Sequence, residues 1–197
     1  YEAGFSRDGQ LQALRAKTYV DGGWSLDLSP AILQRCLFHL DNSYFIPNAD
    51  FEGRIAKTNK TSNTAFRGFG GPQGMAVVEA VMNHAAQILE LDAAKVRALN
   101  FYGETPRNQT PYGQEVIFED NRLDRLFNQL MDESDYDNRM KSIEAFNKQS
   151  KWVKRGIGFQ PVKFGISFTT SMLNQAGALL LVYADGSVQL NHGGTEM

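Results

Sequence analysis

The segment TNKTSNTAFRGFGGPQGM, residues 58–75, constrains the fold most, because it places four glycines and a proline at the entry to the strongest helical pattern. Proline is favoured in the first turn of a helix, where its missing N–H group costs nothing. After Pro72, apolar residues recur at alternating spacings of three and four, at Met75, Val78, Met82, Ala85 and Leu89. We therefore predict a helix that buries one apolar face and is entered through a glycine-rich turn.

The glycine-rich turn is also a candidate binding site, because glycines let a ligand approach the backbone and a helix start presents free N–H groups. Its G-x-G-x-x-x-G spacing is one residue too long for a dinucleotide fingerprint, and no Gly-Lys-Ser/Thr follows as in a phosphate loop. The pattern alone favours a tight turn packed under a helix. Phe66 and Phe69 flank Arg67 there, and such rings are more often buried in a core than stacked on a flat ligand.

The first sixty residues predict strands around one helix. Residues 4–23 carry an Asp-Gly turn signal between roughly alternating residues, as in a β-hairpin. The Ser-Pro pair at 29–30 predicts a helix start with the serine as its cap, and the helix should continue to about His39. A proline and a glycine interrupt the β-forming residues between 42 and 59, which indicates two short strands joined by a loop.

The rest of the chain alternates helical patterns, a loop and strands. The expected helices span about 92–100, with Asp92 as a cap, 121–131 and 136–149, and the expected strands lie in 156–166 and in a hairpin over 176–192. Residues 103–117 are polar and contain two prolines and two glycines, so we expect a long surface loop that could mark a subdomain edge. The fold class is therefore α+β, with mixed strands at both ends and a helical middle.

Several polar side chains could carry chemistry, although each also has an ordinary structural interpretation. Arg35 lies with His39 on the flank of its helix, where an arginine is usually a solvated charge or half of an ion pair. Phe168 and Thr169 lie in a stretch that reads as an ordinary strand, turn and strand. His192 has no second histidine or cysteine at ligand spacing, so we expect a structural histidine and no zinc or iron–sulfur site within this chain.

Charge and cysteine content bear on possible partners. A formal net charge of -2 gives no basic footprint for nucleic acid or an anionic membrane. The single cysteine, Cys36, stands among apolar residues as a small core residue would and fits a reducing, cytoplasmic location. The chain starts at Tyr1 without an initiator methionine and ends directly after a Gly-Gly turn, so we expect it to be a piece of a longer protein.

Four strings resemble one family: RCLFHLDNSYFIPN, SNTAFRGFGGPQGM, KFGISFTTSMLNQAGALL and DGSVQLNHGGTEM. They are similar, in the same order, to the molybdenum-binding portion of xanthine dehydrogenases and oxidases. The resemblance implies that residues 1–197 form part of the molybdenum-cofactor-binding domain of the large, molybdopterin-binding subunit. It also implies an enzyme that oxidises hypoxanthine and xanthine to uric acid in purine catabolism.

The resemblance assigns roles to individual residues of this sequence. Four residues match substrate-binding residues of the family: Arg35, Phe69, Phe168 and Thr169. The two phenylalanines would clamp a flat purine, Thr169 would hydrogen-bond it, and Arg35 would stabilise negative charge on a purine carbonyl oxygen. Those matched to the cofactor are Phe66, Arg67, Gly68 and Met197, with the main chain of Arg67 beside the molybdenum.

The resemblance also implies which parts of the enzyme lie elsewhere. The glutamate that acts as general base, the 2Fe–2S clusters and the FAD belong to other segments, domains or subunits of an oligomeric enzyme. We therefore expect this chain by itself to bind no cofactor and to be inactive. Aldehyde oxidases generally lack an arginine at the position of Arg35, which favours purines over an aldehyde or another N-heterocycle. A non-catalytic module for assembly or for binding flat aromatics is the alternative from a different class.

Overall fold

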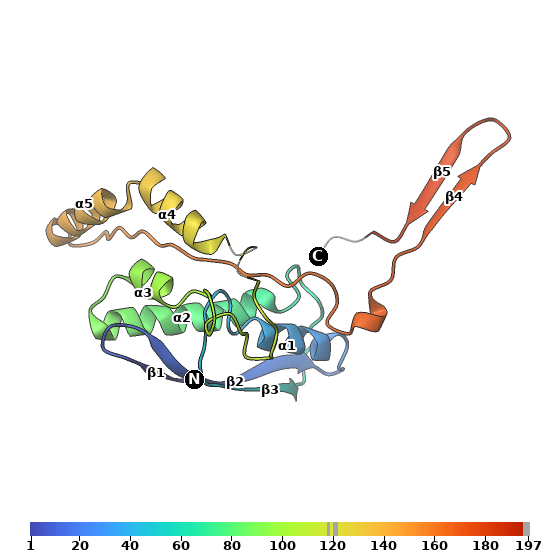
Figure 1. The fold of residues 1–197 in the computed structure, drawn as a ribbon. Coiled ribbons are helices and arrows are strands. Elements are labelled where there is room, and N and C mark those ends of the chain that lie inside the picture. Colours follow the sequence, from blue (N-terminus) through green and yellow to red (C-terminus); the bar gives the residue numbers. More distant parts are fainter. Residues whose placement is uncertain (118, 120–121, 195–197) are drawn as a thin grey trace.

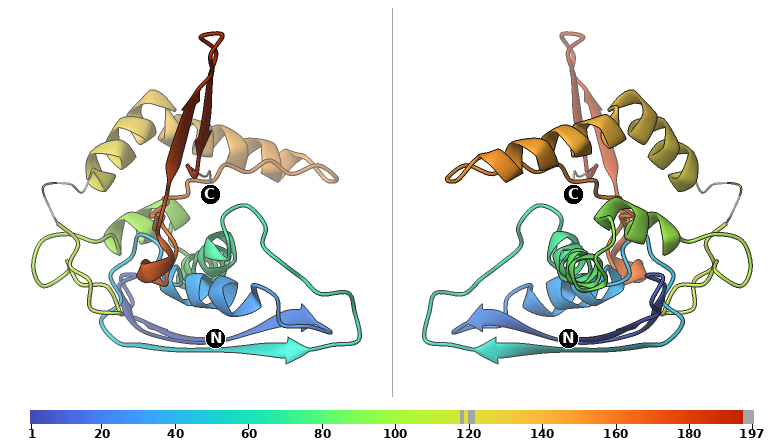
Figure 2. Two further views of the ribbon diagram at one scale, coloured as in Figure 1. Left: turned by 90° about the vertical axis from the view of Figure 1, so that its right-hand side faces the viewer. Right: turned by 90° about the vertical axis from the view of Figure 1, so that its left-hand side faces the viewer.

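The structure of this chain is a computed structural model, and it describes residues 1–117, 119 and 122–194. A small sheet lies at one side of the molecule with α1 and α2 stacked over one face, and α4 and α5 form a further layer beyond them (Figure 1). A separate hairpin projects away from this body, as both views of Figure 2 show. The arrangement confirms the predicted α+β class, with strands at both ends and helices between.

The sheet has the order β1-β2-β3, from β1 (Glu2–Phe5), β2 (Leu11–Gly23) and β3 (Ala49–Lys57). Strands β1 and β2 are antiparallel, which confirms the predicted hairpin. Strands β2 and β3 are parallel, and helix α1 (Ser29–Phe38) lies in the connection between them. A parallel pair needs such a crossover, because its strands cannot be joined by a tight turn.

The prediction of two short strands between residues 42 and 59 is wrong. One continuous strand, β3, passes through Gly53, and Tyr44 only makes an isolated bridge to Phe101. The glycine does not interrupt the strand but allows helix packing, because a Cβ atom at position 53 would lie 2.7 Å from Cδ1 of Leu33 in α1. The glycine is therefore a contact point between β3 and α1.

The predicted serine cap of α1 is also wrong. Ser29 is the first helical residue, Leu28 precedes it in the cap position, and no side chain caps the helix. The Ser29 N–H group already bonds to the carbonyl oxygen of Leu26 in a preceding turn, and the residue is buried. Its hydroxyl therefore faces the interior beside β2 and does not bond the free N–H groups of the helix.

The core lies between the sheet and α2 (Gly71–Leu89), as the apolar spacing predicts. It is built from residues of β2, α2, the helix that follows α2 and the loops between the elements: Leu11, Leu14, Tyr44, Ile46, Val78, Val81, Met82, Ala86, Val96 and Phe101. Cys36 is buried and free, as expected. Helix α3 (Ala93–Leu99) packs next to α2, and its predicted cap is confirmed because the Asp92 carboxylate accepts the Lys95 N–H at 2.9 Å.

The predicted loop over 103–117 contains no helix or strand among its residues, and it leads to α4 (Leu123–Glu133) and α5 (Tyr136–Gln149), which confirm the two predicted helices. After the short 3-10 helix η2 (Ser171–Leu173), strands β4 (Ala178–Val182) and β5 (Val188–His192) form the predicted hairpin. The strands expected within 156–166 are absent, since every one of these described residues lies outside a strand. Among the helices of the described part, none is long and apolar enough to cross a membrane.

Candidate functional site

Helix α1 supplies the polar side chains around which the candidate site is built. Arg35 is only 2% exposed, so its interpretation as a solvated surface charge is wrong. Its two terminal nitrogens donate hydrogen bonds to the carbonyl oxygens of Gly165 and Ser167, which lie 130 and 132 residues further along the chain. Arg35 is buried because residues beyond α5 cross over it.

Those residues form an extended segment, 161–169, which we call the strap. Figure 1 shows the chain running back from α5 across the molecule to η2, and the strap is the last part of this run. At alternate positions the strap bonds to side chains of α1 and of the turn that follows it. The bonds join Asn42 Nδ2 to Pro161 O at 2.9 Å, Lys163 N to Asn42 Oδ1 at 3.0 Å, Gly165 N to His39 Nε2 at 2.9 Å, and Thr169 Oγ1 to Gln34 Oε1 at 2.6 Å.

The strap explains why a strand was predicted and not found. Two extended residues advance by about 6.6 Å, close to the roughly 6 Å covered by four helical residues. The strap runs antiparallel to α1, so its alternate residues can meet side chains that lie progressively earlier in the chain, from Asn42 through His39 to Gln34. The extended conformation was predicted correctly, but its backbone groups pair with helix side chains and not with another strand.

A buried network anchors the strap at its start. Lys163 Nζ bonds the carboxylate of Asp41, which also accepts the Tyr102 hydroxyl at 2.6 Å. Burial raises the pKa of the Asp41 carboxyl, while the ammonium of Lys163 acts in the opposite direction. A buried carboxylate of this kind needs a cation and a hydrogen-bond donor to remain ionised. The pair therefore ties the strap to the turn after α1.

The glycine-rich turn packs directly on α1, which confirms its interpretation as a tight turn. A Cβ atom at Gly70 would lie 2.1 Å from Ile32 O, and one at Gly74 would lie 2.2 Å from Cys36 O. Gly68, Phe69 and Gly70 all have positive φ angles, of 91°, 53° and 99°. A bulky residue such as Phe69 rarely adopts this backbone conformation, and such residues concentrate at functional sites.

The turn and the strap bring the two predicted ring partners together. The centroids of Phe69 and Phe168 are 5.7 Å apart, and their planes are tilted by 57°. Both rings are half-buried, whereas Phe66 is 80% exposed, so core burial is the wrong interpretation for Phe66. Arg67 is exposed at the tip of the same turn.

A cavity of about 440 Å³ adjoins the ring pair. Arg35, Phe168 and Thr169 all line it, together with Phe164 and other strap residues. The structure thus brings together three of the four predicted substrate residues in one cavity, with the fourth, Phe69, in contact with Phe168.

The predicted cofactor residues Phe66, Arg67 and Gly68 do not line this cavity and lie together at the start of α2. Met197 lies outside the described residues.

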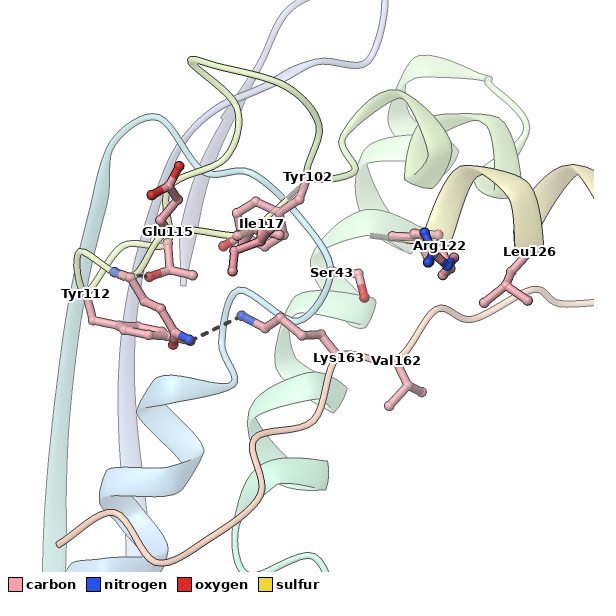
Figure 3. A pocket seen from close by; sticks show the side chains of 13 residues that line it. Ser43, Tyr102, Tyr112, Glu115, Ile117, Arg122, Leu126, Val162 and Lys163 are labelled. Carbon is pink, nitrogen blue, oxygen red and sulfur yellow. Dashed lines mark hydrogen bonds between the residues drawn. The ribbon is translucent and has the colours of Figure 1, made fainter. Parts of the chain in front are cut away.

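A second cavity, of about 420 Å³, lies between the loop before α4, α4 itself and the strap (Figure 3). Lys163 reaches toward Tyr112 there, with 3.3 Å between Nζ and the phenol oxygen. Tyr112, Gln114 and Lys163 line both cavities, so the two adjoin each other at the start of the strap.

Sequence reasoning missed most of the side chains that hold the strap: Gln34, His39, Asp41, Asn42 and Lys163. The sequence pattern places His39 on the same flank as Arg35 but indicates no role for it. Arg35 and His39 are four residues apart, which is the spacing of one helix face, and this pair was the available signal, whereas Asn42 lies in the turn beyond the end of α1. The strap that covers it is about 125 residues away in sequence, so the partner could not be found from spacing alone.

Comparisons with known proteins agree with this fold. Two family models described as molybdopterin cofactor-binding domain match residues 1–101 and 129–197. Over the whole chain, the identity is 50% with xanthine dehydrogenase/oxidase of Gallus gallus and 48% with nicotinate hydroxylase of Emericella nidulans. The chain spans only 14% of the length of each of these relatives.

Solved structures show the same fold. The aldehyde oxidoreductase of Desulfovibrio desulfuricans matches with a TM-score of 0.70 and 26% identity, over 93% of this chain and 19% of that one. The aldehyde oxidoreductase of Desulfovibrio gigas matches with a TM-score of 0.68 and 26% identity, over 95% of this chain and 20% of that one. These matches confirm the resemblance found in the sequence, and the chain belongs to the molybdopterin cofactor-binding domain family, with xanthine dehydrogenases among its relatives.

Proposed function

We propose that this chain is the part of a molybdenum hydroxylase that binds and orients a purine, and that the whole enzyme oxidises hypoxanthine and xanthine to uric acid. The observation that carries the proposal is the cavity lined by Arg35, Phe168 and Thr169, with Phe69 against Phe168. It combines a fixed cation, a hydroxyl and two aromatic rings, which suits a flat, polar heterocycle. The 50% identity to a xanthine dehydrogenase/oxidase supports the same assignment.

The two rings are placed to hold the faces of a purine. A flat ring between two others separates their planes by roughly 7 Å, twice a van der Waals contact of about 3.5 Å. The centroids of Phe69 and Phe168 are 5.7 Å apart, so binding requires the rings to separate slightly and become more parallel. Phe168 is the ring expected to move, because Phe69 belongs to a turn locked against α1 by Gly70.

Arg35 has enough N–H groups to hydrogen-bond the strap and a substrate at the same time. A guanidinium carries five N–H donors, and its two terminal nitrogens each use one of theirs on a strap carbonyl. The remaining N–H groups are available for a purine carbonyl oxygen in the adjoining cavity. A buried, permanently charged donor stabilises negative charge that develops on that oxygen during hydroxylation.

The turn before α2 suits the cofactor. Phe66 and Arg67 are exposed where a 19-residue helix begins, and no acidic residue occupies the first turn of that helix. Such a helix start favours an anionic group, and the pterin cofactor is anionic. We propose that Phe66, Arg67, Gly68 and Met197 contact the molybdenum cofactor, with the Arg67 main chain beside the metal. The bound cofactor would supply the oxidising centre for hydroxylation.

Other functions of the whole enzyme are assigned outside this chain. We propose that the general-base glutamate, the 2Fe–2S clusters and the FAD lie in other segments or subunits of a cytoplasmic, oligomeric enzyme. The family relationship supports the cofactor set, and the 14% coverage of the relatives leaves ample length for these parts.

The test uses the full-length enzyme loaded with molybdenum. Its kcat/KM is measured for xanthine, hypoxanthine, nicotinate and benzaldehyde under the same conditions. We expect the two purines to be the best substrates. A fully loaded enzyme that hydroxylates benzaldehyde but neither purine would contradict the proposal.

Nicotinate is the second candidate substrate, because the nicotinate hydroxylase of Emericella nidulans is 48% identical to this chain, about as similar as the xanthine dehydrogenases. Arg35 would then bind the nicotinate carboxylate, for which a guanidinium is well suited. A kcat/KM for nicotinate above that for xanthine would favour this second candidate.

A further inference from the structure

His39 has both ring nitrogens bonded to the backbone. It is 4% exposed, with Nδ1 lying 2.7 Å from the Arg35 carbonyl oxygen and Nε2 lying 2.9 Å from the Gly165 amide nitrogen. A carbonyl only accepts and an amide N–H only donates, so Nδ1 must carry the proton and Nε2 must accept. The contacts therefore fix His39 as the neutral imidazole protonated on Nδ1.

We infer that neutral His39 is a positioning residue that holds the strap on α1 and so sets the positions of Phe168 and Thr169 at the substrate cavity. The role in holding the strap stands on geometry alone, whereas the effect on substrate rests on the proposed function. Since both ring nitrogens are occupied by backbone groups, His39 acts through the strap and not on the substrate.

His39 bonds to Gly165, which is the middle residue of the strap. Gly165 is held through both of its backbone groups, because its N–H bonds to His39 and its carbonyl oxygen accepts from Arg35. The flanking ring of Phe164 packs on His39, with 5.0 Å between ring centroids.

Phe164 also connects His39 to the end of the glycine-rich turn. A Cβ atom at Gly71 would lie 2.5 Å from Cε2 of Phe164. Phe164 thus contacts both His39 and the start of α2, the helix that follows the Phe69 turn. A shift at His39 would move both sides of the Phe69–Phe168 pair.

The surroundings keep the ring neutral. Burial lowers the pKa of His39, its bond to the Arg35 carbonyl and the carboxylate of Asp41 raise it, and the cations of Lys163 and Arg35 lower it. Asp41 is already paired with Lys163 and with Tyr102. Protonation of Nε2 would turn this acceptor into a donor facing the Gly165 N–H, and the bond would be lost.

The experiment compares two substitutions in the full-length, molybdenum-loaded enzyme. In His39→Gln the side-chain oxygen reaches about as far as Nε2 and can still accept from Gly165. In His39→Asn the amide can still donate to the Arg35 carbonyl, but no atom reaches Gly165. His84→Gln, at an exposed histidine of α2, is the matched control. The readouts are amide hydrogen exchange of a peptide covering the strap, and kcat and KM for xanthine.

We expect His39→Asn to speed strap exchange by about fivefold to tenfold, as for the loss of one buried hydrogen bond. KM should rise severalfold while kcat changes less, and both effects should be absent in His39→Gln and His84→Gln. Unchanged strap exchange in a folded His39→Asn enzyme would overturn the inference. Faster strap exchange with an unchanged KM would overturn the link to substrate binding. In that case, normal turnover of xanthine by the wild type would leave the proposed function intact.

If His39→Asn does not fold, a second measurement tests whether neutral His39 holds the strap. Strap exchange, corrected for the intrinsic effect of pH, is compared at pH 7.5 and 5.5 in the wild type and in His39→Gln. The wild-type strap should exchange faster at the lower pH, and the glutamine variant should not. Equal pH responses would overturn the inference even if the wild type lacked activity on purines, because this readout does not depend on substrate.

Discussion

Asn42 connects the strap to the buried carboxylate of Glu79, since its Nδ2 lies 2.9 Å from Glu79 Oε1 and 2.9 Å from the Pro161 carbonyl oxygen. Glu79 lies on α2, so this one amide joins α2, the turn after α1 and the strap. Asn42 is fully buried and has a φ of 43°, a left-handed conformation that asparagine tolerates better than most residues. Asn42 therefore combines buried side-chain hydrogen bonds with a left-handed backbone conformation.

Substitution of Asn42 should separate these two contributions. Asn42→Ala loses the three side-chain hydrogen bonds and retains the backbone strain, whereas Asn42→Gly loses the same bonds without the strain. We expect both to destabilise the domain, with Asn42→Gly more stable than Asn42→Ala by about 1 kcal/mol. Thermal unfolding of the full-length enzyme measures the difference. Equal melting temperatures would show that the left-handed backbone costs nothing here.

Removing only one charge of the Glu79–Arg97 ion pair should strongly destabilise the domain. The two side chains are each 6% exposed and lie 2.7 Å apart. Glu79→Gln leaves the Arg97 charge buried without its partner, so we expect a loss of about 3–5 kcal/mol in unfolding free energy. Arg97→Met added to Glu79→Gln removes the unpaired buried charge, while the glutamine oxygen still accepts from Asn42 and Tyr44, so this double variant should cost less than Glu79→Gln alone. A larger loss for the double variant, measured by urea unfolding, would contradict this account.

Close packing of the glycine-rich turn on α1 gives a third prediction. Gly70→Ala places a Cβ atom 2.1 Å from Ile32 O and also strains a φ of 99°. Gly113 has a φ of 83° and nothing within 4 Å of an added Cβ, so Gly113→Ala tests the strain alone. We expect Gly113→Ala to cost about 1–2 kcal/mol.

Gly70→Ala should cost clearly more and should also reduce the molybdenum content, because the turn must move away from α1. Melting temperature and metal analysis of the purified enzymes measure the two effects. Equal losses in the two variants would mean that contact with Ile32 is unimportant.

The pKa of His39 predicts how stability depends on pH. Burial lowers this pKa below 6.5, so the folded protein binds fewer protons than the unfolded chain when the pH falls below that value. The stabilisation from neutral His39 is therefore complete above about pH 6.5 and is lost progressively in more acidic solution. The difference in urea midpoint between wild type and His39→Gln, measured at pH 7.5 and 5.5, isolates this contribution. Between pH 7.5 and pH 5.5, the urea midpoint of the wild type should fall by more than that of His39→Gln.

The sequence predicted the elements whose signals are local. The apolar spacing after Pro72 identified α2, and Asp92 identified the start of α3, because both patterns depend only on neighbours in the chain. The strap was misassigned because its partners are side chains of α1 about 125 residues away. Resemblance to a family supplied Phe69 and Phe168 as a pair, which no spacing between residues 69 and 168 could have indicated.

Arg35 gives the last prediction, because its fork geometry should matter more than its charge. Its two terminal nitrogens bind Gly165 O and Ser167 O together, and a lysine ammonium cannot span both carbonyls while also facing the cavity. Under the proposed function, Arg35→Lys should therefore lower kcat/KM for xanthine by about a hundredfold, from weaker electrostatic stabilisation and a looser strap together. Arg54→Lys, at an exposed arginine of β3, is the control and should retain normal kinetics.

The division of the Arg35→Lys effect between KM and kcat identifies its cause. A looser strap misplaces Phe168 and Thr169 in the ground state and raises KM, whereas weaker stabilisation of developing charge lowers kcat. We expect both changes, because the same guanidinium borders the cavity and holds the strap. A rise in KM with kcat unchanged would show that Arg35 only positions the strap. Normal kinetics in Arg35→Lys would show that it does neither.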